Sequence, residues 1–147
     1  MSPSAVLFLC TGNYFRSRFA EHFFNHHAKS GGLPLAADSR GIAIELGHAN
    51  VGPISPFTLE GLARHGIVPP KPLRYPLALG EADLAAAAHV IAVKEAEHRP
   101  MLARKFPEWA DRVEYWRVDD IDCARPAEAM ALLEMEVGRL LERLGVR

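Results

Sequence analysis

Residues 6–17, with the sequence VLFLCTGNYFRS, carry the strongest structural signal in this chain. A short apolar run over residues 5–9 precedes Cys10 and is typical of a strand buried on both faces. A Thr-Gly-Asn break follows, and apolar residues then recur at helical spacing over residues 16–29. The stretch therefore predicts a strand, a tight loop and a helix in direct succession.

Strand and helix signals alternate along the rest of the chain. Strands are predicted at 35–38, 89–93 and 113–118, and helices at 57–65, 81–87, 95–106 and 126–144. Ser55 and Pro56 suit the N-cap and first position of a helix, whereas Pro100 predicts a break or kink. Residues 41–53 and the proline-rich residues 68–76 are expected to be irregular. This alternation predicts a three-layer α/β/α domain with a parallel sheet, spanning residues 1–147.

Composition excludes several classes of protein. The net charge is −1, so the sequence shows no electrostatic footprint for nucleic acid. Two cysteines, Cys10 and Cys123, are too few for a disulfide framework and have no metal-binding spacing. They favour a reducing, cytoplasmic location. No apolar stretch has the length of a membrane helix, so we expect neither a membrane nor a nucleic acid as partner.

The loop after the first strand has the composition of an oxyanion cradle. Five residues separate Cys10 from Arg16, enough to curl into a cup with inward-facing backbone N–H groups at a helix N-terminus. Gly12 eases the tight backbone path. The predicted phosphate-binding residues are Thr11, Gly12, Asn13, Tyr14, Phe15, Arg16 and Ser17.

Roles for individual side chains follow from this cup. Cys10 lies at its base, where the surrounding donors favour a nucleophilic thiolate. Arg16 can grip two phosphate oxygens with its planar fork, and a cation at a helix start makes sense when an anion binds there. Ser17 can donate to the sulfur, and Asn13 can brace the loop. The competing interpretation is an inert buried cysteine and a solvated arginine.

Residues 6–17 resemble the phosphate-binding loop of low-molecular-weight protein tyrosine phosphatases and the related arsenate reductases. Residues 38–41 (Asp-Ser-Arg-Gly) are similar to the family's Ser-Ala-Gly segment, and residues 59–67 and 89–93 to its next helix and third strand. The resemblance implies a four-stranded parallel sheet, no cofactor and no metal. It also implies that Ser39 supports the loop asparagine.

Some positions depart from the family pattern. Phe15 stands where many members carry a second cysteine, and Arg18 where proline is usual. The late Asp-Pro that supplies the family's general acid is absent as such. Within residues 116–122, WRVDDID, Asp120 aligns best with that acid, and Asp119 and Asp122 remain alternatives.

The resemblance implies a cysteine-dependent phosphatase that acts on phosphotyrosine or similar aryl phosphates. Cys10, Arg16 and Asp120 would be catalytic, a phosphorylated protein or small phosphate monoester the partner, and inorganic phosphate the product. Arsenate reduction and non-catalytic phosphate binding are the rival functions. His22 and His26 have the spacing of a metal pair, but surface or partly packed histidines are the simpler interpretation.

Overall fold

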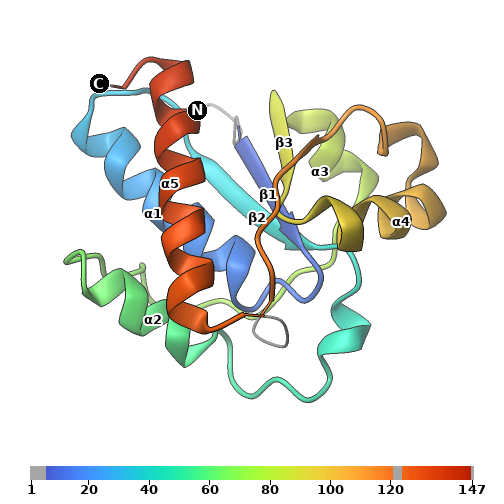
Figure 1. The fold of residues 1–147 in the computed structure, drawn as a ribbon, viewed down its shortest axis with the longest axis horizontal. Coiled ribbons are helices and arrows are strands. Elements are labelled where there is room, and N and C mark those ends of the chain that lie inside the picture. The colour runs from blue at the N-terminus through green and yellow to red at the C-terminus, as the bar shows by residue number, and fades with distance from the viewer. Residues whose placement is uncertain (1–5, 121–123, 147) are drawn as a thin grey trace.

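The computed structural model describes residues 6–120 and 124–146. Four strands form one sheet in the order β2-β1-β3-β4, and all neighbouring strands are parallel. The strands are β1 (Val6–Cys10), β2 (Ala37–Gly41), β3 (His89–Ala92) and β4 (Glu114–Tyr115). The predicted four-stranded parallel sheet is confirmed. Helices lie on both of its faces (Figure 1).

Helices α1 (Arg16–Ser30) and α5 (Pro126–Leu144) pack together on one face, with α2 (Pro56–Ala63) beside them. On the other side lie α3 (Glu81–Ala86) and α4 (Glu95–Lys105) (Figure 1). Short 3-10 turns occur at Ile44–Gly47 and Pro107–Trp109. None of the helices in the described part of the chain is long and apolar enough to cross a bilayer.

The two faces explain why β1 is apolar throughout. Val6 and Phe8 belong to the core beneath α1 and α5, and Leu7 and Leu9 to the core beneath α3 and α4. Because successive side chains of a strand point to opposite faces, a central strand covered on both sides must be apolar at every position. Burying such a side chain stabilises the fold by about 1.5–3 kcal/mol.

The order of the strands indicates where a ligand-binding site should lie. The chain runs from β1 to β2 on one side and later returns to β3 on the other side of β1. Ligands in such sheets bind beyond the carboxyl ends of the strands, where the order reverses. β1 ends at Cys10, so its last residue opens into that crevice.

Several element boundaries differ from the sequence expectation. β2 is Ala37–Gly41 rather than 35–38, and the predicted strand at 113–118 is regular only at Glu114–Tyr115. Pro100 lies inside α4 without ending it, so the predicted break is wrong. Only one intrahelical donor is lost there, and the buried Leu102 keeps the following turn against the sheet.

Candidate active site

The loop between β1 and α1 forms the base of a pocket of about 320 Å³. Cys10 is buried at the strand end, and its Sγ lies 2.9 Å from Ser17 Oγ. The two residues that follow β2 hold the outside of the loop in place. The N–H groups of Ile42 and Ala43 donate to the carbonyls of Cys10 and Thr11. Cys10, Thr11, Gly12, Tyr14, Phe15 and Arg16 all line the pocket.

Asn13 points away from the pocket and holds the loop from behind. Its φ of 52° lies in the left-handed region, which asparagine tolerates better than most residues. The side-chain Nδ2 donates to Ser17 Oγ at 2.8 Å and to Ser39 Oγ at 2.9 Å. Its Oδ1 accepts from the Leu77 N–H at 3.1 Å. The structure thus brings together all three residues that were predicted to support the loop.

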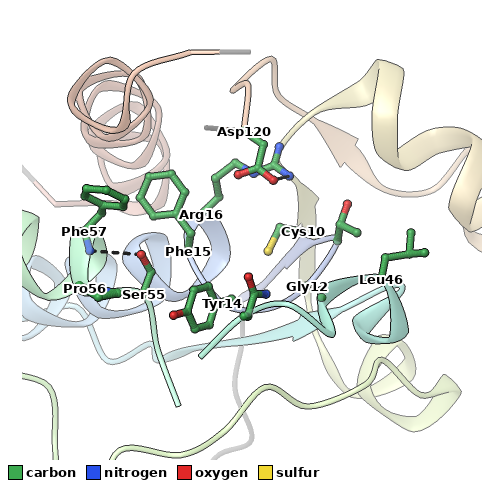
Figure 2. A pocket seen from close by; sticks show the side chains of 13 residues that line it. Cys10, Gly12, Tyr14, Phe15, Arg16, Leu46, Ser55, Pro56, Phe57 and Asp120 are labelled. Carbon is green, nitrogen blue, oxygen red and sulfur yellow. Dashed lines mark hydrogen bonds and ion pairs between the residues drawn. The ribbon is translucent and has the colours of Figure 1, made fainter. Parts of the chain in front are cut away.

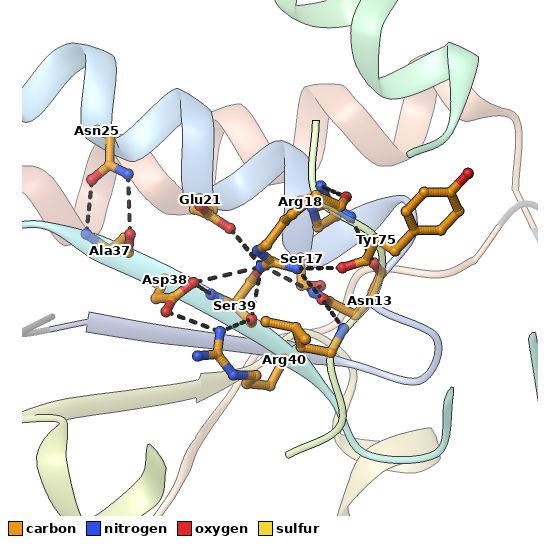
Figure 3. A network of polar contacts seen from close by, with 12 residues as sticks. Asn13, Ser17, Arg18, Glu21, Asn25, Ala37, Asp38, Ser39, Arg40 and Tyr75 are labelled. Atoms are coloured by element: carbon orange, nitrogen blue, oxygen red, sulfur yellow. Dashed lines mark hydrogen bonds and ion pairs between the residues drawn. The ribbon is translucent and has the colours of Figure 1, made fainter. Parts of the chain in front are cut away.

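Two arginines to which the sequence analysis gave no role complete this support. Arg74, from the proline-rich segment, donates to Asn13 Oδ1 at 2.9 Å and to Ser39 Oγ at 3.0 Å. Arg18 donates to the carbonyls of Asn13, Pro53 and Arg74 at 3.3, 2.9 and 2.7 Å. Figure 3 shows Asn13, Ser17, Ser39 and Arg18 in one polar network. The guanidinium groups therefore join three separate segments beneath the phosphate loop.

Arg16 lies at the start of α1 and is 2% exposed. Its NH1 donates to Glu97 Oε1 at 3.2 Å and to the Val118 carbonyl at 2.9 Å, and its NH2 donates to Glu97 Oε2 at 2.9 Å. Burial by itself lowers the pKa of Arg16, but hydrogen bonding to Glu97 and the charge of Cys10 raise it above the usual value. The guanidinium is therefore a fixed cation beside the nucleophile.

Glu97 and its neighbour His98 are site residues that sequence reasoning missed. Thr11 Oγ1 donates to Glu97 Oε2 and lies 3.1 Å from His98 Nε2. Burial would raise the pKa of Glu97, but hydrogen bonds from His98 and Arg16 hold it below its usual range. The available signal was positional, because Glu97 follows β3 by only a few residues at the edge of the sheet where ligands bind.

Of the three candidate acids, Asp120 lines the pocket, and its Oδ2 lies 3.5 Å from Arg16 NH2. Figure 2 shows its carboxylate across the mouth from Cys10. Asp119 turns elsewhere and pairs with Lys94 Nζ at 2.6 Å. Asp122, like Cys123, lies outside the described residues.

Apolar side chains surround the mouth. Tyr14 and Phe57 lie on one side and Leu46 on the other (Figure 2). Phe57 is 41% exposed and Leu46 is 61% exposed. The Tyr14 hydroxyl donates to the Val51 carbonyl at 2.5 Å, which fixes the ring at the rim. Such walls suit a flat, apolar group attached to the phosphate.

His22 and His26 lie on α1, away from the pocket. Within residues 6–120 and 124–146, no group of three His, Cys, Asp or Glu side chains is arranged to hold a metal ion. The pair therefore gains no further ligand from the described residues.

A protein-family model, described as low molecular weight phosphotyrosine protein phosphatase, matches residues 5–144. The chain belongs to this family. A phosphatase of this family is a hydrolase that uses a cysteine, takes a phosphorylated substrate and releases phosphate.

Solved structures agree with this assignment. The low molecular weight protein tyrosine phosphatase from T. tengcongensis is 27% identical, with a TM-score of 0.79 over 96% of this chain and 99% of that one. YfkJ from Bacillus subtilis is 26% identical, with a TM-score of 0.77 over 98% and 96% of the two chains. The YwlE arginine phosphatase from Geobacillus stearothermophilus shares the fold at 24% identity, with a TM-score of 0.74 over 97% and 93%. No curated protein matches the chain.

Proposed function

We propose that this phosphatase hydrolyses aryl phosphate monoesters, with phosphotyrosine as the preferred substrate class. The observation that carries the proposal is the placement of Cys10, Arg16 and Asp120 around one pocket whose rim is aromatic. A phosphate seated in the loop would place its ester group between Tyr14 and Phe57. Phosphotyrosine extends far enough from the protein backbone to reach the sulfur at the base.

The proposed reaction has two steps. The Cys10 thiolate attacks phosphorus, the phosphorus–oxygen ester bond breaks, and Asp120 gives its proton to the leaving phenolic oxygen. Water then attacks the cysteinyl phosphate while Asp120 takes its proton, and the thiolate departs. Arg16 and the loop N–H groups stabilise the charge on the transferred group in both steps. The Ser17 hydroxyl, 2.9 Å from Sγ, stabilises the departing sulfur.

Hydrolysis of para-nitrophenyl phosphate by the wild type and by Cys10→Ser tests the nucleophile. Loss of the thiolate should lower kcat by more than about 10⁴-fold, whereas Cys123→Ser should retain turnover. The same assay separates the rival functions. Tight phosphate binding without turnover indicates a binding module, and a Cys123-dependent reduction of arsenate indicates a reductase. Either result contradicts the proposal.

A second assay tests the substrate class on matched peptides that carry phosphotyrosine, phosphoserine or phosphoarginine. The charged residues among the described pocket lining are Arg16 and Asp120, and the rim combines the apolar Tyr14, Leu46 and Phe57 with the uncharged polar residues Asn50 and Ser55. We therefore expect kcat/KM to be highest for phosphotyrosine, because its ring can pack on the rim. The phosphoarginine arm is included because related structures are arginine phosphatases. A preference for phosphoarginine would contradict the aryl assignment and leave the Cys10 chemistry intact.

Asparagine variants at positions 119, 120 and 122 identify the acid. Asp120→Asn should lower kcat by about 10²-fold or more on a substrate with a poor leaving group, since proton donation contributes about that factor. Asp119→Asn should have little effect because this side chain pairs with Lys94 outside the pocket. An unchanged rate for Asp120→Asn would exclude it as the acid.

A further inference from the structure

Glu97, in the first turns of α4, is the point at which both ends of the phosphate loop meet a third segment. One carboxylate accepts from Thr11, the residue after the nucleophile, and from both terminal nitrogens of Arg16. We propose that Glu97 is a positioning residue for hydrolysis, which sets the orientation of the Arg16 guanidinium toward the phosphate. This inference rests on the proposed function.

The hydrogen bonds of the Arg16 guanidinium show how Glu97 orients it. Arg16 NH1 uses its two N–H groups on Glu97 Oε1 and the Val118 carbonyl, and NH2 uses one on Glu97 Oε2. The remaining N–H groups, on Nε and NH2, lie on the other edge of the planar fork. An arginine grips an oxyanion with two parallel N–H groups, so Glu97 selects which edge is available for it.

His98 in turn fixes Glu97. The imidazole is fully buried, and its Nδ1 accepts from the Lys94 backbone N–H at 3.1 Å. When the ring is neutral, this bond places its proton on Nε2, which lies 3.3 Å from Glu97 Oε2. Burial lowers the pKa of His98, so the ring is neutral at ordinary pH. The carboxylate therefore has donors on several sides and a single stable position.

Glu97 and Asp120 both contact the positive charge of Arg16. Arg16 lies between two carboxylates, at 2.9 Å from Glu97 and 3.5 Å from Asp120. The other charged or titratable groups that face them are Cys10 and His98, while Lys94 is paired with Asp119. Glu97 holds both terminal nitrogens of Arg16, whereas Asp120 approaches NH2 alone, so Glu97 sets the orientation of the guanidinium.

Glu97→Gln tests the proposal, with Glu95→Gln as the matched control. Glu95 lies on the same helix but pairs with Arg99, away from the pocket. Hydrolysis of a phosphotyrosine peptide and inhibition by inorganic phosphate should both be measured. Glu97→Gln should lower kcat and weaken the inhibition by phosphate, each about tenfold, because an amide cannot hold both terminal nitrogens of Arg16 as a carboxylate does. Glu95→Gln should change neither.

Glu97→Asp separates the effect of the negative charge at this position from the effect of the hydrogen bonds that Glu97 makes. The shorter side chain keeps a carboxylate that can bind both terminal nitrogens of Arg16, although not Thr11 as well, so kcat and phosphate inhibition should fall less than in Glu97→Gln. Thermal unfolding of each variant shows whether it is folded. If Glu97→Gln does not fold, the kinetics of Glu97→Asp, compared with those of Glu95→Gln, decide the matter in its place.

The outcomes distinguish this inference from the proposed function. A wild type without turnover contradicts the function itself. An active wild type whose folded Glu97 variants match Glu95→Gln overturns the positioning role. A lower kcat with unchanged inhibition by phosphate in Glu97→Gln also overturns it, because a misoriented Arg16 should bind phosphate less tightly.

Discussion

Arg18 buries a full positive charge under the phosphate loop, at 1% exposure. Burial and the nearby charge of Arg74 lower its pKa to about 10, so it remains protonated at neutral pH. Its hydrogen bonds reach the carbonyls of Asn13, Pro53 and Arg74. A buried charge of this kind is tolerated only when such partners surround it.

Replacing Arg18 therefore tests the support beneath the loop. Arg18→Met fills a similar volume but leaves the three carbonyls without this donor, so the free energy of unfolding should fall by about 2 kcal/mol or more. Arg18→Lys should recover only part of the loss, because an ammonium group cannot span the same three acceptors. Urea unfolding measures both, with the exposed Arg64→Met as the control. An Arg18→Met variant as stable as that control would show that the bonds contribute nothing.

Among single residues, the sequence identified those whose side-chain chemistry and spacing suggest a reaction. It missed those whose role depends on the side chains that they contact in the fold. Cys10 and Arg16 stand out because their spacing has a chemical meaning. Glu97 and Arg74 look like ordinary surface charges until the fold brings them to the loop from positions far along the chain. Their roles depend on tertiary contacts, which local patterns do not encode.

Among the elements, β2 shows why a pattern of apolar residues misplaces the ends of a strand. Its residues Ser39, Arg40 and Gly41 are polar or small, so the predicted strand ended too early. Ser39 is nevertheless fully buried, because Asn13 and Arg74 donate to its hydroxyl and Glu21 accepts from it at 2.6 Å. The predicted bounds of α5, by contrast, match the structure, since its apolar stripe and its initial proline are local signals.

Gly41, the last residue of β2, lies close against the phosphate loop. An added Cβ would lie 2.8 Å from the Thr11 carbonyl oxygen and 3.1 Å from Asn13 Cβ. Gly41→Ala should therefore shift the loop, lower kcat/KM at least about tenfold and destabilise the protein by about 1–3 kcal/mol.

Gly138→Ala on α5 is the matched control. An added Cβ there meets nothing within 4 Å, so the change should stabilise the helix by about 0.5–1 kcal/mol and leave hydrolysis unaltered. Thermal unfolding and para-nitrophenyl phosphate kinetics check both variants. If Gly41→Ala behaves like Gly138→Ala, the loop does not depend on this close approach.

At the scale of the whole molecule, the free energy of unfolding should fall in mild acid because several histidines are packed in the fold. Burial lowers the pKa values of His22, His27 and His98, and for His22 burial and the charges of Arg18 and Arg74 lower it from 6.5 to about 4. The unfolded chain then binds more protons than the folded one across this interval. The contribution of the neutral His22 side chain to the free energy of unfolding is complete above pH 6.5 and is lost as the pH falls toward 4.

His22→Gln tests this sensitivity. Urea unfolding measured from pH 7 to pH 4 should show a shallower decline for His22→Gln than for the wild type, and no change for the exposed His48→Gln. Burial raises the pKa of Glu21, so this residue adds stability as the pH falls, opposite to His22. Because Glu21 is present in all three proteins, its contribution cancels when they are compared. Parallel curves for all three proteins would mean that His22 does not contribute.

The bond from Arg16 to the Val118 carbonyl joins the anion-binding half of the pocket to the segment that carries Asp120. Val118 is fastened to the sheet in its turn, through its N–H on the Val93 carbonyl at 2.7 Å. Through this bond, a change in the position of Arg16 on anion binding would be passed to residues 117–120, and a shift of those residues would change the affinity for the anion by the same factor. Anion binding and the placement of Asp120 would thus be coupled through one main-chain carbonyl.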